Sequence, residues 1–307
     1  MTFSLGIVGG GKIARDQHVP AIAASGDFTL AAAVTLADSE LPGVPNFRTI
    51  AEMAREMPEV RALVFCTPPR VRHRLVLEAL AHGLDVLNEK PPAFSMAEAE
   101  DIAARAKAAG RVLYQSWHSR EAAAVEPARA WLKGKTIRRM TVTWKEDVRV
   151  WHPGQEWIWE PGIGVFDPGI NALSVVTVLL PELALERAEL RFPANKQAPI
   201  AASLAYDSGG IPVAVEFDFD QKGPQTWDID IETGQGLLKL SLGASKMAID
   251  GRPVDVGAEP EYAALYRRFA ELLKARQSDV DLTPFAHVVD ALEKGARVTV
   301  KPFSWTG

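Results

Sequence analysis

The sequence predicts an α/β protein with two parts: a parallel, doubly wound sheet first, then an α+β part with a large, mostly antiparallel open sheet. Three observations support this. The chain has 307 residues, and at roughly 150 residues per domain this length suits two domains. Up to about residue 120, short apolar runs alternate with segments of helical periodicity. Beyond that point, longer strand-like runs follow one another through Gly-containing turns.

In the first part, short apolar runs end at glycines or polar residues, which predicts buried strands. Gly83 and Gly110 are placed to end two helices, and Ser95 with Glu98 is spaced as a capping box. Strands joined through helices pair in parallel. The expected strands are residues 3–8, 28–34, 61–66, 85–88 and 112–115, and the expected helices are residues 12–24, 70–82 and 95–109.

The second part has a different rhythm, with turns such as the one at residues 207–210 joining extended runs. We therefore divide the chain into residues 1–120 and residues 121–307. The expected strands are residues 137–147, 183–192, 200–206, 212–219, 227–232 and 236–242, and the expected helices are residues 121–133, 164–179, 261–275 and 284–294.

Composition excludes several classes of protein. Hydrophobic residues make up 47% of the chain, which is typical of a globular protein. The net charge is −5, which argues against the clustered positive charge that a nucleic-acid-binding surface needs. Cys66 is the only cysteine, so a disulfide framework and a thiolate zinc site are excluded, and we expect a buried core residue there. No apolar run is long enough for a membrane helix, and no signal-peptide pattern is present. We expect a cytoplasmic protein without a metal.

The segment GGGKIA directly follows the first expected strand and fits the pattern G-x-G-x-x-[G/A]. Gly9 permits a tight turn, Gly11 lets the backbone approach a pyrophosphate, and Ala14 keeps the helix close to the sheet. The alternative is a purely structural glycine turn. We interpret the segment as the phosphate-binding turn of a Rossmann dinucleotide-binding domain, in which Gly9, Gly11, Lys12 and Ile13 bind the cofactor.

The end of the second strand bears on the choice between NAD and NADP. An acidic residue there binds the ribose 2′-hydroxyl, and an arginine binds a 2′-phosphate. No arginine follows directly, and Asp38 lies several residues beyond the strand. Thr35 could donate to either group, or could be a simple strand-end residue. We expect the protein to accept NAD or NADP.

Two further segments carry a family resemblance. TPPRVRH (residues 67–73) follows the third strand, and NEKPP (residues 88–92) follows the fourth. With the glycine turn, they resemble the glucose–fructose oxidoreductase / inositol dehydrogenase family. The resemblance implies a dinucleotide-binding domain followed by an open-sheet domain that often mediates dimerisation. It also implies that Thr67, Pro68 and His73 border the nicotinamide, and that Glu89 and Lys90 belong to the cofactor and catalytic site.

Position supports this interpretation, because ligands of open α/β sheets bind beyond the carboxyl ends of the strands. Thr67 and Lys90 both lie just past such ends. The alternatives are a solvated surface lysine at Lys90 and a capping or surface histidine at His73, since the neighbouring Arg72 and Arg74 are expected to face solvent.

Asp167 and Asn171 lie four residues apart, on one face of an expected helix. The family's usual pattern here is Asp-x-x-x-His, and this sequence has asparagine in place of the histidine. Asparagine cannot accept a proton, which leaves Asp167 and Lys90 as the acid–base pair, in either assignment, with Asn171 positioning the substrate. The alternative role for Asp167 is a helix cap.

Tryptophans gather between residues 117 and 159, where six of the eight lie. Indole rings stack on the apolar faces of sugars, while polar side chains bind the hydroxyls; packing in the core or at a dimer face is the alternative. The motifs look like the aldose 1-dehydrogenase branch of the family. That resemblance assigns the substrate contacts to His118, Glu146, Trp151, Asn171 and Trp227.

The function implied by this resemblance is NAD(P)-dependent oxidation of the anomeric carbon of an aldose, such as D-galactose or L-arabinose, to the lactone. The alternatives are a polyol dehydrogenase, a keto-sugar reductase, and a non-enzymatic sugar or cofactor sensor on the same fold. The expected partners are the sugar and a second copy of the chain, paired through the C-terminal sheet to form a homodimer.

Overall fold

The computed structural model describes residues 2–306, and these form two compact units. The first unit comprises the chain up to Glu121 together with Pro260–Leu282. The second comprises Ala122–Glu259 together with the residues from Thr283 onward. The sequence predicts a single division at residue 120, whereas residues 260–282 belong with the first unit and not with the second.

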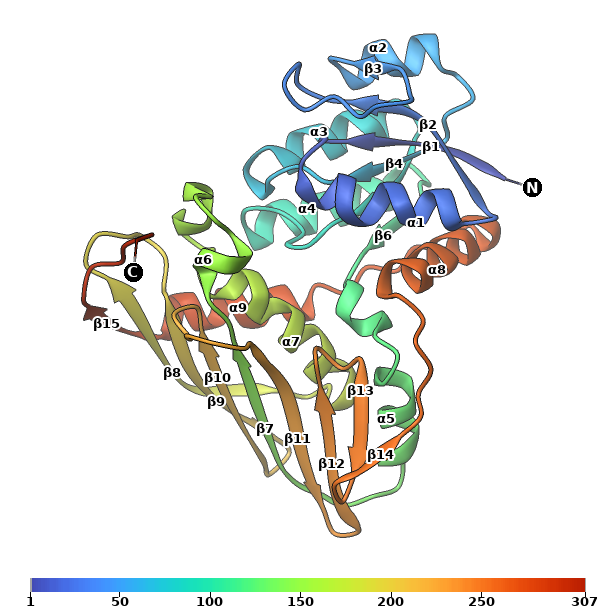
Figure 1. Ribbon diagram of the computed structural model, residues 1–307. Helices are drawn as coiled ribbons and strands as arrows, with labels where there is room; N and C mark the ends of the chain where they lie inside the picture. Colours follow the sequence, from blue (N-terminus) through green and yellow to red (C-terminus); the bar gives the residue numbers. More distant parts are fainter. Residues whose placement is uncertain (1, 307) are drawn as a thin grey trace. The chain divides into compact units, whose positions relative to one another are not determined.

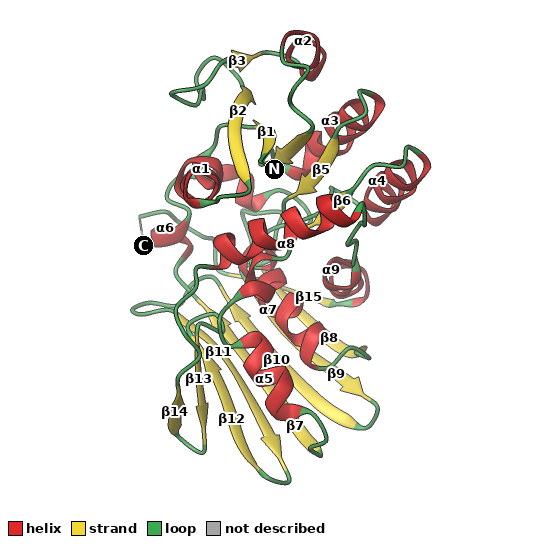
Figure 2. Ribbon diagram, turned by 90° about the vertical axis from the view of Figure 1, so that its right-hand side faces the viewer, coloured by secondary structure: helices red, strands yellow, loops and turns green. Residues whose placement is uncertain are grey.

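The first unit is built on a six-stranded sheet in the order β3-β2-β1-β4-β5-β6, in which every pair is parallel. Helices α1 and α8 lie on one face of this sheet, and α3 and α4 lie on the other (Figures 1 and 2). The strands are β1 Phe3–Val8, β2 Phe28–Val34, β3 Asn46–Phe47, β4 Ala62–Phe65, β5 Asp85–Asn88 and β6 Leu113–Gln115; the helices are α1 Val19–Ala24, α2 Ile50–Glu56, α3 Pro69–Ala81, α4 Met96–Ala108 and α8 Glu261–Ala275, with short turns η1 Ala14–His18 and η2 His118–Glu121.

Helix α8 joins the first unit through an aromatic face. The Phe269 ring stacks on Phe28 of β2 with centroids 5.6 Å apart, and it also stacks on Tyr114 of β6 at 6.2 Å. Tyr266 meets Phe28 edge-on at 5.5 Å. The rings of Tyr266 and Phe269 are fully buried in these contacts with the parallel sheet. Burial of this apolar surface stabilises the packing of α8 in the first unit, although the helix comes late in the sequence.

The second unit contains a nine-stranded mixed sheet in the order β14-β13-β12-β11-β7-β10-β9-β8-β15. Its pairs are antiparallel except β7 with β10 and β8 with β15. Helices α5, α7 and α9 lie along one face (Figure 2). The strands are β7 Ile137–Lys145, β8 Ala184–Pro193, β9 Ala201–Ser208, β10 Ile211–Asp218, β11 Thr226–Thr233, β12 Gly236–Ser241, β13 Lys246–Ile249, β14 Arg252–Val254 and β15 Ala296–Val300; the helices are α5 Val125–Leu132, α6 Val148–Trp151, α7 Phe166–Leu179 and α9 Thr283–Lys294, with the turn η3 Glu156–Trp159.

Helix α7 is the central helix of the second unit and is almost entirely buried. A Cβ added at Gly169 would lie 2.6 Å from the Phe217 ring, so this glycine lets the helix approach β10 closely. Only Asp167, Asn171 and Val178 of α7 are partly accessible. The predicted i, i+4 face of Asp167 and Asn171 is therefore present.

The structure adds elements that the sequence did not predict. These are the short strands β3, β13, β14 and β15 and the helices α2 and α6. The predicted helix over residues 12–24 contains a π-helical turn at Ala14–His18. Within residues 2–306, none of the helices has the length and apolar character needed to cross a membrane.

Candidate active site

The glycine turn has the shape that a dinucleotide needs. Gly9 adopts φ +95°, and a Cβ there would lie 3.1 Å from atoms of Cys66 and Thr67. A Cβ at Gly10 would lie 1.7 Å from the carbonyl oxygen of Ser39. A Cβ at Gly11 would meet nothing within 4 Å. The turn is thus packed tightly against two neighbouring loops and open at Gly11, where a pyrophosphate can approach the backbone.

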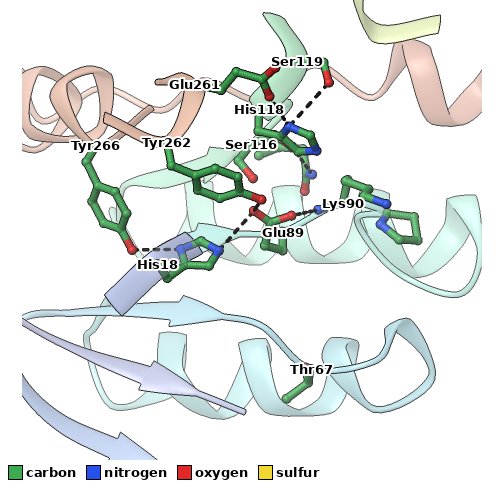
Figure 3. A network of polar contacts seen from close by, with 12 residues as sticks. His18, Thr67, Glu89, Lys90, Ser116, His118, Ser119, Glu261, Tyr262 and Tyr266 are labelled. Atoms are coloured by element: carbon green, nitrogen blue, oxygen red, sulfur yellow. Dashed lines mark hydrogen bonds and ion pairs between the residues drawn. The ribbon is translucent and has the colours of Figure 1, made fainter. Parts of the chain in front are cut away.

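Two buried hydroxyls lie at the carboxyl edge of the same sheet. Thr67 lies two residues beyond the end of β4, and Ser116 directly follows β6 (Figure 3). Among residues 2–306, neither Thr67 Oγ1 nor Ser116 Oγ has a hydrogen-bond partner. Buried polar groups are nearly always hydrogen-bonded, so these atoms fit a site that takes a polar ligand. The residues present therefore suit a bound dinucleotide.

Arg72 is buried, contrary to the prediction that it faces solvent, and it binds the backbone of two loops: the Thr-Pro loop at Thr67 and the Glu-Lys-Pro loop at residues 89–91. The residue is 3% exposed, and its guanidinium donates hydrogen bonds to the carbonyl oxygens of Thr67, Glu89 and Pro91. Burial lowers the pKa of Arg72 to about 10, so the group keeps its charge at neutral pH. The hydrogen bonds of Nη1 and Nη2 explain how this arginine can be buried, and they tie the Thr-Pro loop to the Glu-Lys-Pro loop. Within residues 2–306, its Nε has no hydrogen-bond partner.

The carboxylate of Glu89 lies in a buried polar network that we call the Glu89 network, formed with His18, Tyr262 and Tyr266 (Figure 3). Glu89 Oε1 lies 3.2 Å from His18 Nε2 and accepts a hydrogen bond from the Tyr262 hydroxyl at 3.2 Å. Glu89 Oε2 accepts the backbone N–H of Lys90 at 3.0 Å. The Tyr266 hydroxyl lies 2.9 Å from His18 Nδ1. Side chains of α8 thus reach the loop that carries Lys90.

Charge in the Glu89 network is stabilised by its partners. Burial alone would raise the pKa of Glu89, but the hydrogen bond and charge of His18, with the charges of His118 and Lys90, lower it to about 2. Burial likewise opposes the charged form of His18, but Cys66, Tyr266 and Glu89 raise the pKa of His18 well above its usual value. The two groups therefore form a buried ion pair at neutral pH.

The two predicted site histidines of the first unit, His73 and His118, have carboxylate partners. His118 Nδ1 lies 2.6 Å from Glu261 Oε2, and its ring stacks on Tyr262 at 5.3 Å. His73 Nε2 lies 2.8 Å from Asp101 Oδ2 of α4. The rings of both residues are thus oriented from within the first unit, His118 by α8 and His73 by α4.

The remaining predicted cofactor residues of the first unit lie around the glycine turn. Lys12 forms an ion pair with Asp16, and Ile13 is 37% exposed. Pro68 is exposed directly after Thr67. Thr35 is 5% exposed, and its hydroxyl donates to Asn46 Oδ1 at 3.0 Å. The hydroxyl proton of Thr35 is therefore used inside the fold.

In the second unit, three predicted substrate residues come together. Glu146 Oε2 accepts the indole N–H of Trp227 at 2.9 Å, and the Trp151 ring lies 5.1 Å from the Trp227 ring. Trp227 also stacks on Trp144 at 5.8 Å, because β11 pairs with β7 at these two positions. Glu146 is 3% exposed and Trp151 is 40% exposed, so a buried carboxylate lies beside indole surface that a ligand can reach.

Asp167 has a histidine partner that the sequence analysis missed. Asp167 Oδ2 lies 3.4 Å from His152 Nε2, with side-chain exposures of 11% and 18%. His152 follows α6, so this imidazole comes from a separate segment and not from position 171 of α7. Its place directly after Trp151 was visible in the sequence, but nothing there indicated a contact with residue 167.

The tryptophan-rich segment divides between packing and accessible surface. Trp117, Trp144 and Trp159 are at most 4% exposed, and the Trp117 indole donates to the carbonyl of Asp281. Trp151 and Trp157 are 40% and 38% exposed. The packing alternative therefore holds for the three buried tryptophans.

The chain is similar to known oxidoreductases over nearly its whole length. Residues 3–116 match the family described as "Oxidoreductase family, NAD-binding Rossmann fold". Galactose 1-dehydrogenase of Pseudomonas fluorescens is 48% identical over 305 residues, which cover 97% of this chain and 98% of that protein. The crystal structure of D-galactose-1-dehydrogenase from Rhizobium etli is 47% identical, covers 99% and 98% of the two chains, and has a TM-score of 0.94. The 3-ketoreductase KijD10 of Actinomadura kijaniata, at 16% identity and a TM-score of 0.84, shares the fold.

Proposed function

This chain belongs to the oxidoreductase family with the NAD-binding Rossmann fold, and from this premise we propose that it oxidises the anomeric carbon of an aldose to the lactone. The substrate is D-galactose or a sugar of similar shape, such as L-arabinose. One observation carries the proposal: 48% identity to a galactose 1-dehydrogenase over 97% of the chain. The cluster of Glu146, Trp151 and Trp227 supports it, because stacked indoles beside a carboxylate suit a sugar ring.

Oxidation at C1 removes a hydride and the proton of the C1 hydroxyl, and the nicotinamide cofactor, when bound, accepts the hydride at C4. We assign the proton to the carboxylate of Asp167, which has His152 within ion-pair distance. Lys90 orients the C1 hydroxyl and stabilises the negative charge that develops on its oxygen. Asn171, one helical turn along α7 from Asp167, positions the same hydroxyl.

The remaining predicted site residues have supporting roles in this proposal. Gly9, Gly11, Lys12 and Ile13 bind the pyrophosphate side of the cofactor, while Thr67, Pro68 and His73 border the nicotinamide. Glu89 contributes through the backbone of Lys90, since its carboxylate accepts that N–H. His118, Glu146, Trp151 and Trp227 contact the sugar hydroxyls and ring faces.

Assembly and location complete the proposal. We propose a homodimer paired through the nine-stranded sheet, supported by the arrangement of α5, α7 and α9 along one face of that sheet (Figure 2). Sedimentation analysis would give twice the mass of 33.4 kDa for such a dimer. We also propose that the enzyme acts in the cytoplasm, where both forms of the cofactor are available.

The function is tested by following the absorbance of reduced nicotinamide. The purified protein is mixed with NAD⁺ or NADP⁺ and with a panel of aldoses and inositols. Reduction with galactose or arabinose, and none with inositol, is the expected result. Reduction with inositol alone would contradict the proposal and indicate a polyol dehydrogenase. No reduction with any member of the panel, with cofactor binding retained, would also contradict it.

A further inference from the structure

The carboxyl end of β2 has an arginine that comes from the neighbouring strand. β2 ends at Val34, which pairs in parallel with Phe47 of β3, so the next residues along both strands, Thr35 and Arg48, lie side by side. Arg48 Nη1 donates to the carbonyl oxygen of Thr35 at 3.0 Å. In Rossmann folds this strand end meets the adenosine ribose, where an acidic residue or an arginine distinguishes the 2′-hydroxyl from a 2′-phosphate.

Two guanidinium groups meet at Glu40. Arg48 Nη2 forms an ion pair with the Glu40 carboxylate, and both side chains are 48% exposed. Arg15 donates to the carbonyl of Glu40 at 2.9 Å and, through Nε, to the carbonyl of Gly10 at 2.9 Å. The loop after β2 is thereby tied to the glycine turn. Glu52 also faces this position, because its carboxylate accepts the backbone N–H of Arg48 at 3.1 Å.

Other groups at the strand end are less suited to bind the ribose substituent. The Thr35 hydroxyl donates its proton to Asn46 inside the fold, and Leu36 is apolar and 73% exposed. Arg48 combines a fixed position with an accessible face, and a guanidinium can donate two parallel hydrogen bonds to a phosphate.

We propose that Arg48 is the residue that selects NADP(H), by binding the 2′-phosphate of the adenosine ribose, and that Glu40 is its exchangeable partner. With NADP⁺ bound, the phosphate replaces the Glu40 carboxylate on the guanidinium. With NAD⁺ bound, the Arg48–Glu40 pair stays intact, and the Glu40 carboxylate accepts a hydrogen bond from the ribose 2′-hydroxyl. The chain then accepts both cofactors through one ion pair. This inference rests on the nicotinamide dinucleotide cofactor of the proposed function, and not on which sugar is oxidised.

The test measures cofactor binding without sugar, so that its failure and the failure of sugar oxidation are distinguishable. Binding of NADP⁺ and NAD⁺ to the intact protein is titrated calorimetrically. Arg48→Gln removes one or two charge-assisted hydrogen bonds, so we expect the Kd of NADP⁺ to rise about 10- to 100-fold and that of NAD⁺ to change less than about 2-fold. Glu40→Gln removes the competing carboxylate, so NADP⁺ binds more tightly and NAD⁺ more weakly.

Arg55→Gln is the matched control. Arg55 is an exposed arginine of α2 that pairs with Glu56, as Arg48 pairs with Glu40, and its side chain is 71% exposed. We expect both Kd values to be unchanged in this variant. Arg48→Lys keeps the charge but loses the bidentate geometry, so its Kd for NADP⁺ should lie between those of the wild type and Arg48→Gln. An equal change of both Kd values in Arg48→Gln, or no change in either, overturns the proposal, as does a wild-type protein that does not bind NADP⁺.

Discussion

The Lys90 loop of the first unit and the Asp167 face of the second unit position their polar groups by different means. The Lys90 loop rests on buried charge: Arg72 binds three carbonyls, and Glu89 forms a buried pair with His18. Asp167 instead projects from a helix packed by apolar contacts and has a partly exposed histidine partner. Replacing a residue of a buried ion pair should therefore change the stability of the fold and its dependence on pH. Replacing a polar residue on an otherwise apolar helix should change the stability little.

The largest expected effect is on turnover, at Asp167. Asp167→Asn keeps the size of the side chain and one acceptor oxygen, but the amide cannot accept a proton. We expect kcat to fall about 10²- to 10⁴-fold. The unfolding free energy and the Kd of the cofactor should change little, since α7 is stabilised by its buried apolar residues. Steady-state kinetics and urea denaturation measure the two quantities.

Two further variants accompany this prediction. Asp207→Asn changes a carboxylate of the same unit at the β9–β10 turn, where it accepts the N–H of Gly210, and should leave kcat unchanged. Lys90→Met should also lower kcat while cofactor binding is retained. Near-normal turnover in Asp167→Asn or in Lys90→Met would refute the roles proposed for these residues.

The second prediction concerns Glu89 and is about stability. Glu89→Gln leaves His18 without its carboxylate partner in a buried site, which should cost about 3–5 kcal/mol of unfolding free energy. The pKa of Glu89 is lowered from 4.5 to about 2. A lowered pKa stabilises the fold above the unfolded-state value, and this contribution is lost as the pH falls toward 2. The wild type should therefore lose stability over this acid range more steeply than Glu89→Gln.

Deprotonation of His18 determines the pH above which the same ion pair no longer stabilises the fold. The pKa of His18 is raised, so its contribution is complete below the unfolded-state value and is lost as the pH rises through the folded-state value. Urea denaturation of the wild type and Glu89→Gln, from about pH 2 to about pH 8, measures both limbs. A constant difference between the two proteins across this range would show that the pair does not ionise as described.

A third, smaller effect is expected at the tryptophan cluster. Trp227→Phe keeps an aromatic ring between Trp144 and Trp151 but removes the N–H that Glu146 accepts. A hydrogen bond to a charged group contributes about 1.5–3 kcal/mol, so we expect KM for the sugar to rise about 10-fold or more. Trp144→Phe changes the buried stacking partner instead, and should lower stability without this rise in KM. Equal KM values for the two variants would argue against a sugar contact through Glu146.

The smallest effect is expected at the outer hydroxyl of the Glu89 network. Tyr266→Phe removes the hydrogen bond to His18 Nδ1 and should cost about 1 kcal/mol of unfolding free energy. Tyr206→Phe is a matched control in the second unit, because within residues 2–306 this buried hydroxyl has no hydrogen-bond partner. We expect Tyr206→Phe to leave the free energy of unfolding unchanged. If both variants lose the same stability, the hydroxyl of Tyr266 makes no specific contribution.

Much of the fold could be predicted from the sequence, because buried parallel strands are short apolar runs between clear stop signals. The strands over residues 28–34 and 85–88 and the helix over residues 261–275 have the bounds predicted. β3, β13 and β14 have two to four residues, too few for a period to be seen. The helix over residues 261–275 was predicted, but its periodicity could not show which sheet its aromatic face covers.

The positions of candidate site residues could be predicted where residue type and strand end coincide, as at Gly9, Thr67 and Lys90. They could not be predicted where a contact joins distant segments. Arg72 stands between other polar residues and was expected at the surface, yet three carbonyls from two loops surround its guanidinium. The pairing of His152 with Asp167 likewise depends on how α6 and α7 pack, which no local pattern encodes.

The return of α8 to the first unit has a consequence for synthesis on the ribosome. The parallel sheet is complete once Gln115 has been made, but Phe28 and Tyr114 stay uncovered until Phe269 emerges. His18 and Glu89 meanwhile lack the hydroxyls of Tyr266 and Tyr262. We therefore expect the first unit to stay partly folded while the strands β7 to β14 are translated. A gene fragment ending at residue 121 would encode the glycine turn and Lys90 without the helix that completes their unit.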